Sequence, residues 1–372
     1  MSKLNLSENL IGEETNLNTA IYPINSYFPQ AFGMALAHAF TNNRMVILYA
    51  GRIASWLCSL LLFYYAIKVT PKGKGILFML FMMPMTLHEA ISLSADGMTI
   101  GVVALFCAWF MRAFMYPHLY GKREKIGWFF LALGVTTFKV MYFPLIFTLV
   151  FLPEACFENK KEKQKSVAMI IGGALLCLAG WAVYCYFAYF NAPQYEVVSD
   201  TSNGMKQQMI MLLTQPFRVL SVMIQTIEHN FSEWIYTGIG SNLSWYNVPI
   251  SSIVYLPIAY LIVCRLTKDR EGRTEIEESD RYQKLNKGFW LSTVLSALVV
   301  MIFLLVWWTD SEAQYISGIQ GRYFIPICIM FFFALISKKE KDNEIQISEK
   351  ECCAISVLAI CSIINILVYT LV

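Results

Sequence analysis

One stretch decides how the chain is arranged: residues 126–152 read IGWFFLALGVTTFKVMYFPLIFTLVFL, an apolar run with Lys139 at its centre and Pro144 shortly after it. Four basic residues between 112 and 125 precede the run, and four more between 160 and 165 follow it. Because cytoplasmic connectors carry an excess of Lys and Arg, both ends of the run are expected on one side of a membrane. The run therefore predicts two half-helices, each too short to cross about 30 Å of hydrocarbon, that form a broken, re-entrant pair.

The composition places the whole chain in a membrane. Apolar residues make up 57% of the sequence and charged residues 15%, whereas soluble domains carry about 25% charged residues. Apolar windows of about twenty residues predict an all-α, polytopic transmembrane bundle of about eight full spans plus the broken pair. The full spans are expected at 46–67, 75–92, 98–115, 166–190, 248–264, 289–308, 323–337 and 352–371.

The basic residues orient these spans. Five connectors hold most of the 29 Lys and Arg residues, and all five fall on one side when the broken pair returns to its starting side. The positive-inside rule makes that side cytoplasmic. The chain is therefore predicted to be a multi-pass plasma-membrane protein whose N-terminus and polar face are extracytoplasmic. Its formal net charge of +3 does not indicate binding to nucleic acid.

The same pattern divides the chain into four regions. The longest outer connector holds two apolar stretches separated by Pro216, which predict interfacial helices; loop packing without lipid contact is the alternative. Mixed charges further along predict a solvated cytoplasmic linker. The regions are an extracytoplasmic N-terminal segment (1–45), a membrane core with the broken pair (46–190), the outer connector (191–247), and C-terminal transmembrane helices (248–372) with the linker at 265–288.

Cysteines and histidines predict neither a disulfide framework nor a structural metal site. The ten cysteines lie in apolar spans or beside lysine-rich connectors, which is not the pattern of a disulfide-stabilised domain. The four histidines are scattered, and no Cys-x-x-Cys or His-x-x-x-His pair occurs, so the spacing of a zinc site is missing. A divalent metal ion that accompanies a substrate stays an open alternative.

Ionisable residues within the spans identify the candidate site, because each charge in hydrocarbon costs at least about 2.5–3.5 kcal/mol. Arg52 lies inside the first span, Lys139 at the break and Arg322 at the outer start of the seventh span. Glu89 and Asp96 flank the outer turn between the second and third spans. The cations are suited to neutralising a lipid phosphate, and a carboxylate is suited to taking the proton of an attacking hydroxyl.

Each of these residues also has a purely structural interpretation. Arg52 and Arg322 are suited to snorkelling toward the membrane interface. Ser94 or Asp96 is suited to capping the third span. Lys139 is suited to pairing with a buried acid such as Glu89.

A series of short motifs runs in order across most of the chain. The more specific ones are Ser-x-Ser-Ala-Asp at 92–96 and Gln-Gly-Arg-Tyr at 320–323. Together with the others, they resemble a family of multi-spanning bacterial membrane proteins known only as a domain of unknown function. The other pieces are Tyr22-Pro23 with Tyr27 and Pro29, Gly51-Arg52, Pro84-Met85, and Lys139 with Tyr142 and Pro144.

That family is similar to the GT-C class of glycosyltransferases, which take sugars from polyprenyl-phosphate donors at the outer membrane face. The resemblance implies a GT-C-like fold and a glycosyltransferase of the bacterial plasma membrane that acts in cell-surface glycan assembly. Its partners would be membrane lipid, a lipid-linked sugar as donor substrate and a glycan acceptor. On this interpretation the catalytic candidates are Asp96 and Glu89, and the candidates for binding lipid phosphate or substrate are Arg52, Lys139, Tyr142, Gln320, Arg322 and Tyr323.

The chain departs from the family pattern at its beginning. The family usually starts with an additional transmembrane helix and an outer segment bearing a Pro-Asp-Glu and His motif, and the first outer loop of GT-C enzymes commonly carries the catalytic acid. Glu13-Glu14 does not match that motif. Residues 1–45 also lack a preceding helix to carry them across a membrane. Either this segment is translocated unaided as a polar tail, or an upstream helix is missing. We favour the second interpretation, in which the site of this polypeptide is incomplete on its own.

Two other classes of function fit the same residues. A transporter or flippase for a lipid-linked or anionic substrate would use the intramembrane cations and the broken helix. The two halves of the chain show no self-similarity of the kind expected for an inverted repeat. A non-catalytic membrane scaffold would explain the spans and leave Lys139 without a role.

Overall fold

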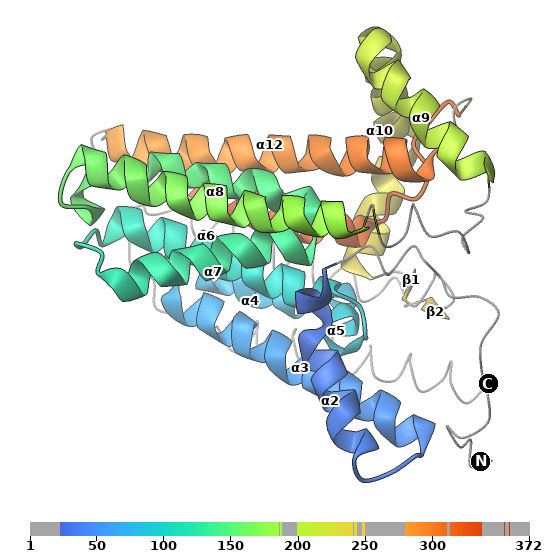
Figure 1. The fold of residues 1–372 in the computed structure, drawn as a ribbon, viewed down its shortest axis with the longest axis horizontal. Coiled ribbons are helices and arrows are strands. Elements are labelled where there is room, and N and C mark those ends of the chain that lie inside the picture. Colours follow the sequence, from blue (N-terminus) through green and yellow to red (C-terminus); the bar gives the residue numbers. More distant parts are fainter. Residues whose placement is uncertain are drawn as a thin grey trace.

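The computed structural model describes residues 23–185, 187, 199–240, 242–243, 248–249, 280–310, 313–336, 353 and 357. Within them the protein is a bundle of helices with a two-residue antiparallel ladder of β1 (Asn242–Leu243) and β2 (Val248–Pro249). The long helices lie nearly parallel or antiparallel to one another, namely α6 (Asp96–Met115), α7 (Lys122–Phe138), α8 (Lys160–Cys185) and α12 (Asp280–Trp308) (Figure 1). Helices α9 (Ser199–Thr214) and α10 (Pro216–Ile239) stand across one end of the bundle (Figure 1). The predicted polytopic helical bundle is confirmed.

Among the described residues, four helices are long and apolar enough to cross a membrane, and up to six spans result if each of two bent helix pairs is one span. These four coincide with expected spans. The predicted spans at 248–264 and 352–371 lie outside the described residues apart from isolated positions, so the number eight stays a prediction. The four helices are α3 (Arg44–Val69), α6 (Asp96–Met115), α8 (Lys160–Cys185) and α12 (Asp280–Trp308).

The span predicted at 75–92 is not one continuous helix. It consists of α4 (Lys74–Phe81) and α5 (Pro84–Ile91), which are bent by 66° relative to each other. Pro84 takes the first position of α5, where its missing N–H leaves no helical bond unmade. The preceding Met83 is extended, with φ −59° and ψ 137°, as steric contact with a following proline requires. The bend carries the end of α5 to the polar cluster described below.

The break at Lys139 lies where it was predicted. α7 (Lys122–Phe138) ends there, the backbone of Lys139 is extended, and the 3-10 helix η2 (Val140–Phe151) follows. The Tyr120 N–H donates a hydrogen bond of 2.9 Å to the carbonyl of Cys156, so the segment begins and ends at the same end of the bundle. α7 has 17 residues, about 25 Å at 1.5 Å per residue, which is longer than the expected half-helix and still short of about 30 Å of hydrocarbon.

The remaining elements pack around this core. Helix α2 packs closely on α3 at Gly33. A Cβ atom at this position would clash with Ala50 and Ala54 of α3. α9 and α10 are bent by 107°, as the proline at the start of α10 favours. The predicted span at 323–337 begins as a 3-10 turn and continues as a short helix. The elements are η1 (Ile24–Tyr27), α2 (Phe28–His38), η3 (Glu154–Cys156), α9 (Ser199–Thr214), α10 (Pro216–Ile239), η6 (Gly321–Phe324) and α13 (Ile325–Ile336).

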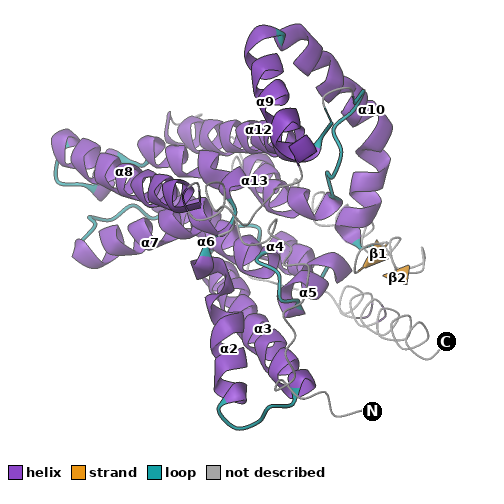
Figure 2. Ribbon diagram, turned by 45° about the vertical axis from the view of Figure 1, so that its right-hand side comes forward, coloured by secondary structure: helices purple, strands orange, loops and turns teal. Residues whose placement is uncertain are grey.

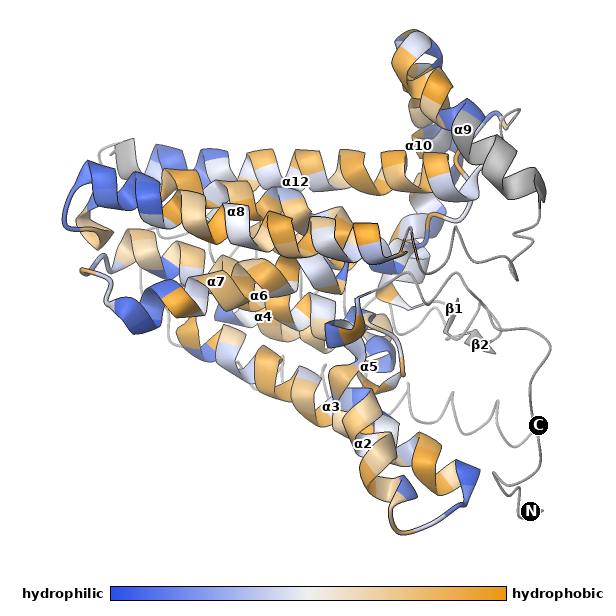
Figure 3. Ribbon diagram, in the orientation of Figure 1, coloured by the Kyte–Doolittle hydropathy of each residue, from blue (hydrophilic) through white to orange (hydrophobic). Residues whose placement is uncertain are grey.

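The two ends of the bundle differ in polarity. Basic residues gather where α7 and α8 begin. Figure 3 shows that this end is hydrophilic and that the middle of the bundle is mostly apolar. Buried aromatic side chains, including Phe110 and Phe289 in edge-to-face contact, fill the interior. At the opposite end, α6 begins with Asp96 and α7 ends before Lys139. A second polar region therefore lies at the end remote from the basic connectors.

Candidate functional site

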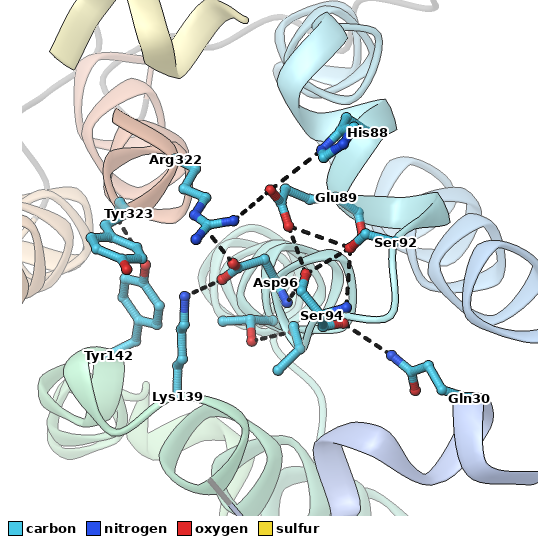
Figure 4. Close-up of polar contacts among 12 residues, drawn as sticks. Gln30, His88, Glu89, Ser92, Ser94, Asp96, Lys139, Tyr142, Arg322 and Tyr323 are labelled. Atoms are coloured by element: carbon cyan, nitrogen blue, oxygen red, sulfur yellow. Dashed lines mark hydrogen bonds and ion pairs between the residues drawn. The ribbon is translucent and has the colours of Figure 1, made fainter. Parts of the chain in front are cut away.

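Four charged side chains from distant parts of the sequence meet at this second polar region (Figure 4). Glu89 comes from the last turn of α5, Asp96 from the first residue of α6, Lys139 from the break after α7 and Arg322 from η6. We call these four residues the charge cluster. Apart from Arg52, the charged residues that the sequence singled out are thus brought together.

Asp96 bridges the two cations of the cluster. Its Oδ1 forms an ion pair with the Nζ of Lys139, and its Oδ2 lies 3.7 Å from the Nε of Arg322. The side chains of Asp96 and Lys139 are 9% and 5% exposed. Asp96 also occupies the first turn of α6, where the positive end of the helix dipole stabilises a carboxylate. The prediction that Asp96 caps this helix is wrong, because Ala95 holds the N-cap position and no side chain there makes a capping hydrogen bond. Stabilisation of Asp96 by the helix dipole is compatible with its place in the site.

Glu89 is the most deeply buried member of the cluster, with 1% of its side chain exposed. Its Oε1 accepts a hydrogen bond of 2.8 Å from Nη1 of Arg322, and its Oε2 accepts one of 2.6 Å from the hydroxyl of Ser94. The Nδ1 of His88 lies 3.5 Å from the same Oε1. Both carboxylate oxygens of Glu89 are therefore engaged.

The turn between α5 and α6 holds these carboxylates by local hydrogen bonds. The Ser92 hydroxyl donates to Oγ of Ser94 over 2.8 Å, and Oγ of Ser94 accepts the Asp96 N–H over 3.2 Å. Gly97 lets α6 start against the end of α5, because a Cβ there would lie 2.6 Å from Cα of Ala90. Small and hydroxyl-bearing residues in the 92–97 stretch thus set the spacing of the two acids.

The charges within the cluster balance, but they differ in access. Two carboxylates and two cations are paired, which is the arrangement that a buried charge requires to offset its desolvation. The side chains of Arg322 and His88 are 28% and 29% exposed, whereas that of Glu89 is almost inaccessible. An incoming anion would therefore meet Arg322 first.

Two tyrosines predicted to bind substrate form one wall of the cluster. The ammonium of Lys139 lies 4.3 Å from the ring centroid of Tyr323, within the range of a cation–π contact. The hydroxyl of Tyr142 donates a hydrogen bond of 2.8 Å to the carbonyl of Tyr323. Tyr142 on η2 is therefore tied to η6, the turn that carries Arg322.

Gln30 on α2 contacts the turn that carries the two acids, and the sequence analysis did not identify it. Its Nε2 donates to the carbonyl of Ser94 over 3.0 Å and to Oγ of Ser55 over 3.2 Å, and the residue is 3% exposed. A glutamine in a short helix before the first span has no distinguishing spacing or charge. Only its contacts show that it joins α2 and α3 to the turn between the two acids.

Two other predicted substrate residues lie apart from the charge cluster. Arg52 is exposed on α3, with its guanidinium carbon 5.7 Å from the ring centroid of Tyr49. Gln320 is partly exposed, and its carbonyl accepts the Tyr323 N–H over 3.0 Å. Their assignment to substrate binding stays a prediction. The exposed position of Arg52 also fits an arginine that snorkels to the membrane interface.

The described part of the chain holds no group of three or more His, Cys, Asp or Glu side chains arranged to bind a metal ion. In the charge cluster, Asp96 forms an ion pair with Lys139 and Glu89 forms one with Arg322. The expectation that no structural metal is needed stays a prediction.

Comparison with known protein families gives a match over most of the chain. The family described as "Predicted membrane protein (DUF2142)" matches residues 4–331, a range that contains all four residues of the charge cluster. No match was found among curated proteins or among solved structures.

Proposed function

The chain belongs to the DUF2142 family of predicted membrane proteins, and from its charge cluster we propose that it is a membrane glycosyltransferase of the GT-C type. It would transfer a sugar from a polyprenyl-phosphate donor to a glycan acceptor during cell-surface glycan assembly in a bacterial plasma membrane. The reacting face would be extracytoplasmic, because the cluster lies opposite the basic connectors.

The observation that carries this proposal is the partly exposed Arg322 in front of two buried carboxylates. Arg322 contacts Glu89 over 2.8 Å and Asp96 over 3.7 Å. A guanidinium binds phosphate oxygens in a bidentate manner. A phosphate on Arg322 would take over the bond that Glu89 now accepts and leave that carboxylate oxygen free to accept the proton of the attacking hydroxyl. Binding of the donor would thereby prepare the base.

The proposed reaction assigns a role to each member of the cluster. The acceptor hydroxyl attacks the anomeric carbon of the sugar, its proton passes to Glu89, and the bond between that carbon and the phosphate oxygen breaks. The leaving polyprenyl phosphate keeps the electron pair, and Arg322 and Lys139 stabilise its charge. Asp96 holds both cations in place. The Ser94 hydroxyl, 2.6 Å from Glu89, connects the buried carboxylate to the half-buried turn.

The test is made in the native host. The gene is deleted and complemented with wild type, Glu89→Gln, Arg322→Ala or Asp96→Asn, and lipid-linked saccharides and surface glycan are measured by mass spectrometry. Loss of the base or of the phosphate-binding cation should lower transfer by about 100-fold or more, so the glycan is lost and its lipid-linked precursor accumulates. Lys125→Gln, at the other end of the bundle, is the matched control and should behave like wild type at equal expression.

If deletion leaves both the surface glycan and the pool of lipid-linked precursors unchanged, the proposal is refuted. A flippase is the second candidate, because the bent pair of α4 and α5 is typical of the discontinuous helices of transporters. Purified protein in vesicles that moves a lipid-linked saccharide across the bilayer without transferring its sugar would favour the flippase.

A further inference from the structure

Helix α10 carries an exposed apolar stripe along its length. The side chains recur every three or four residues, which places them on one side of a helix. Each is between 43% and 86% exposed. The stripe consists of Phe217, Leu220, Ile224, Ile227, Phe231 and Ile235.

A second face of α10 is polar and also exposed. It is formed by Arg218, Ser221, Gln225, Glu228 and Ser232. The helix has 24 residues, about 36 Å at 1.5 Å per residue, which is long enough to cross a bilayer. Crossing would place Arg218 and Glu228 against hydrocarbon at a cost of several kcal/mol. One apolar and one polar face are instead typical of a helix that lies in the plane of the interface.

The orientation of α10 agrees with such a position. It stands across the direction of the long helices at the end of the bundle (Figures 1 and 2). Gln208 of the neighbouring α9 donates hydrogen bonds to the carbonyls of Thr309 and Asp310, over 3.1 and 2.8 Å, directly after the end of α12. At that end Trp308 is 53% exposed, as is common for tryptophan at the level of lipid headgroups.

The third face of α10 is buried against the segment that leads to Arg322. Thr226 accepts the N–H of Ile316 over 2.8 Å, and Thr237 accepts the N–H of Gly321 over 3.2 Å. The rings of Trp234 and Phe324 stack at 4.9 Å. The segment is therefore fixed along α10 at both of its ends.

Gly321 makes the closest approach in this contact. A Cβ at Gly321 would lie 2.2 Å from the backbone N of Gly238 and 2.2 Å from the carbonyl oxygen of Trp234. Both are backbone atoms and cannot rotate away. The position of η6, and with it that of Arg322, follows the position of α10.

We propose that α10 lies in the lipid headgroup layer, with its stripe in the acyl boundary, and that its contact with Gly321 holds Arg322 at headgroup depth. The partner of the stripe is the lipid surface. This placement needs no catalytic activity. Its coupling to Arg322 rests on the proposed function, since it brings the cation to the depth at which the phosphate of a lipid-borne substrate lies.

The first experiment tests lipid contact in the full chain. The photoreactive residue p-benzoylphenylalanine replaces Phe231 on the stripe or Gln225 on the polar face, and the protein is irradiated in vesicles of phosphatidylethanolamine and phosphatidylglycerol. An interfacial helix should give about tenfold more lipid adduct at position 231 than at position 225. Equal adducts at both positions would mean a spanning helix, and no adduct at 231 would mean contact with protein or water; either result overturns the proposal.

The second experiment tests the coupling to Arg322. Thr237→Val removes the acceptor of the Gly321 N–H and should lower saccharide transfer about five- to tenfold, as loss of one hydrogen bond of about 1 kcal/mol or slightly more would do. Thr237→Ser keeps the hydroxyl and should restore transfer, while lipid adducts at position 231 stay unchanged in both variants. Transfer that is equal in the Val and Ser variants would refute the coupling alone, whereas absence of transfer in wild type would refute the proposed function and leave the lipid placement standing.

Discussion

Two lysine–carboxylate pairs lie at opposite ends of the bundle, and they differ mainly in their surroundings. Lys139 pairs with Asp96 at the end that holds the charge cluster, with side chains 5% and 9% exposed. Lys125 pairs with Glu162 at the end with the basic connectors, with side chains 28% and 23% exposed. Both pairs join residues far apart in sequence and connect α7 or its end to a neighbouring helix.

The difference shows which pair the fold depends on. Water and dissolved ions screen the Lys125–Glu162 pair, so it contributes little. Lys139 and Asp96 have lost most of their hydration, so each needs the other. Such a buried pair adds little stability compared with apolar residues of the same size, yet removing one partner is costly. Its presence beside Arg322 therefore agrees better with a functional site than with a need for stability.

The largest effect is expected for Asp96→Asn. The change leaves the ammonium of Lys139 buried without its carboxylate, and loss of one partner of a buried pair costs about 3–5 kcal/mol. The measurement is the midpoint of thermal unfolding of the purified protein in detergent. The double variant Asp96→Asn, Lys139→Met removes both charges and should recover most of the midpoint without recovering saccharide transfer. A single variant as stable as wild type would show that water reaches this pair freely.

The next effect is expected for Gly97→Ala, which tests how the carboxylates are spaced. The new Cβ would lie 2.6 Å from Cα of Ala90 and 2.8 Å from the carbonyl oxygen of Glu89, so α5 and α6 must move apart. Overpacking of this kind costs about 1–3 kcal/mol, and the same unfolding midpoint reports it. Gly180→Ala on α8 is the control, because a Cβ there meets nothing within 4 Å. Equal midpoints for the two variants would mean that the turn adapts without strain.

The sequence predicted the helical bundle and most of the cluster because both follow from the cost of placing polar groups in hydrocarbon. Lys139 and the break beside it were found from their depth in an apolar run flanked by basic residues. The structural interpretation paired it with a buried acid, for which Glu89 was the example, and the acid that the structure pairs with it is Asp96. Which acid reaches which cation depends on how α5, α6 and η6 converge, and no local pattern encodes that convergence.

Two features were missed for related reasons. The bend at Pro84 falls inside an apolar window that hydropathy alone reads as one span, although the proline itself was a signal for a break. Gln30 carries no charge, and its burial results from the packing of α2 on α3 and on the turn around Ser94. A residue whose role consists of contacts to backbone carbonyls and hydroxyls has no signature in a single sequence.

A smaller effect is expected for Ser94→Ala. The change removes the hydroxyl that donates to Glu89 over 2.6 Å and accepts the Asp96 N–H over 3.2 Å. Loss of these two bonds should lower the free energy of unfolding by about 1–2 kcal/mol and reduce saccharide transfer more than stability. Ser221→Ala, on the exposed face of α10, should change neither quantity. A Ser94→Ala protein with full transfer would exclude the hydroxyl from the path of the proton.

The smallest effect is expected for Lys125→Gln, the counterpart of the change at Asp96. The glutamine keeps much of the side-chain length and removes the charge that faces Glu162, which water and mobile ions already screen. We expect the unfolding midpoint to stay within error of the wild-type value at low salt and at high salt, with transfer unchanged. A drop in the midpoint approaching that of Asp96→Asn would mean that the two ends of the bundle are equally dependent on their ion pairs. The contrast between them would then have to be explained by something other than burial.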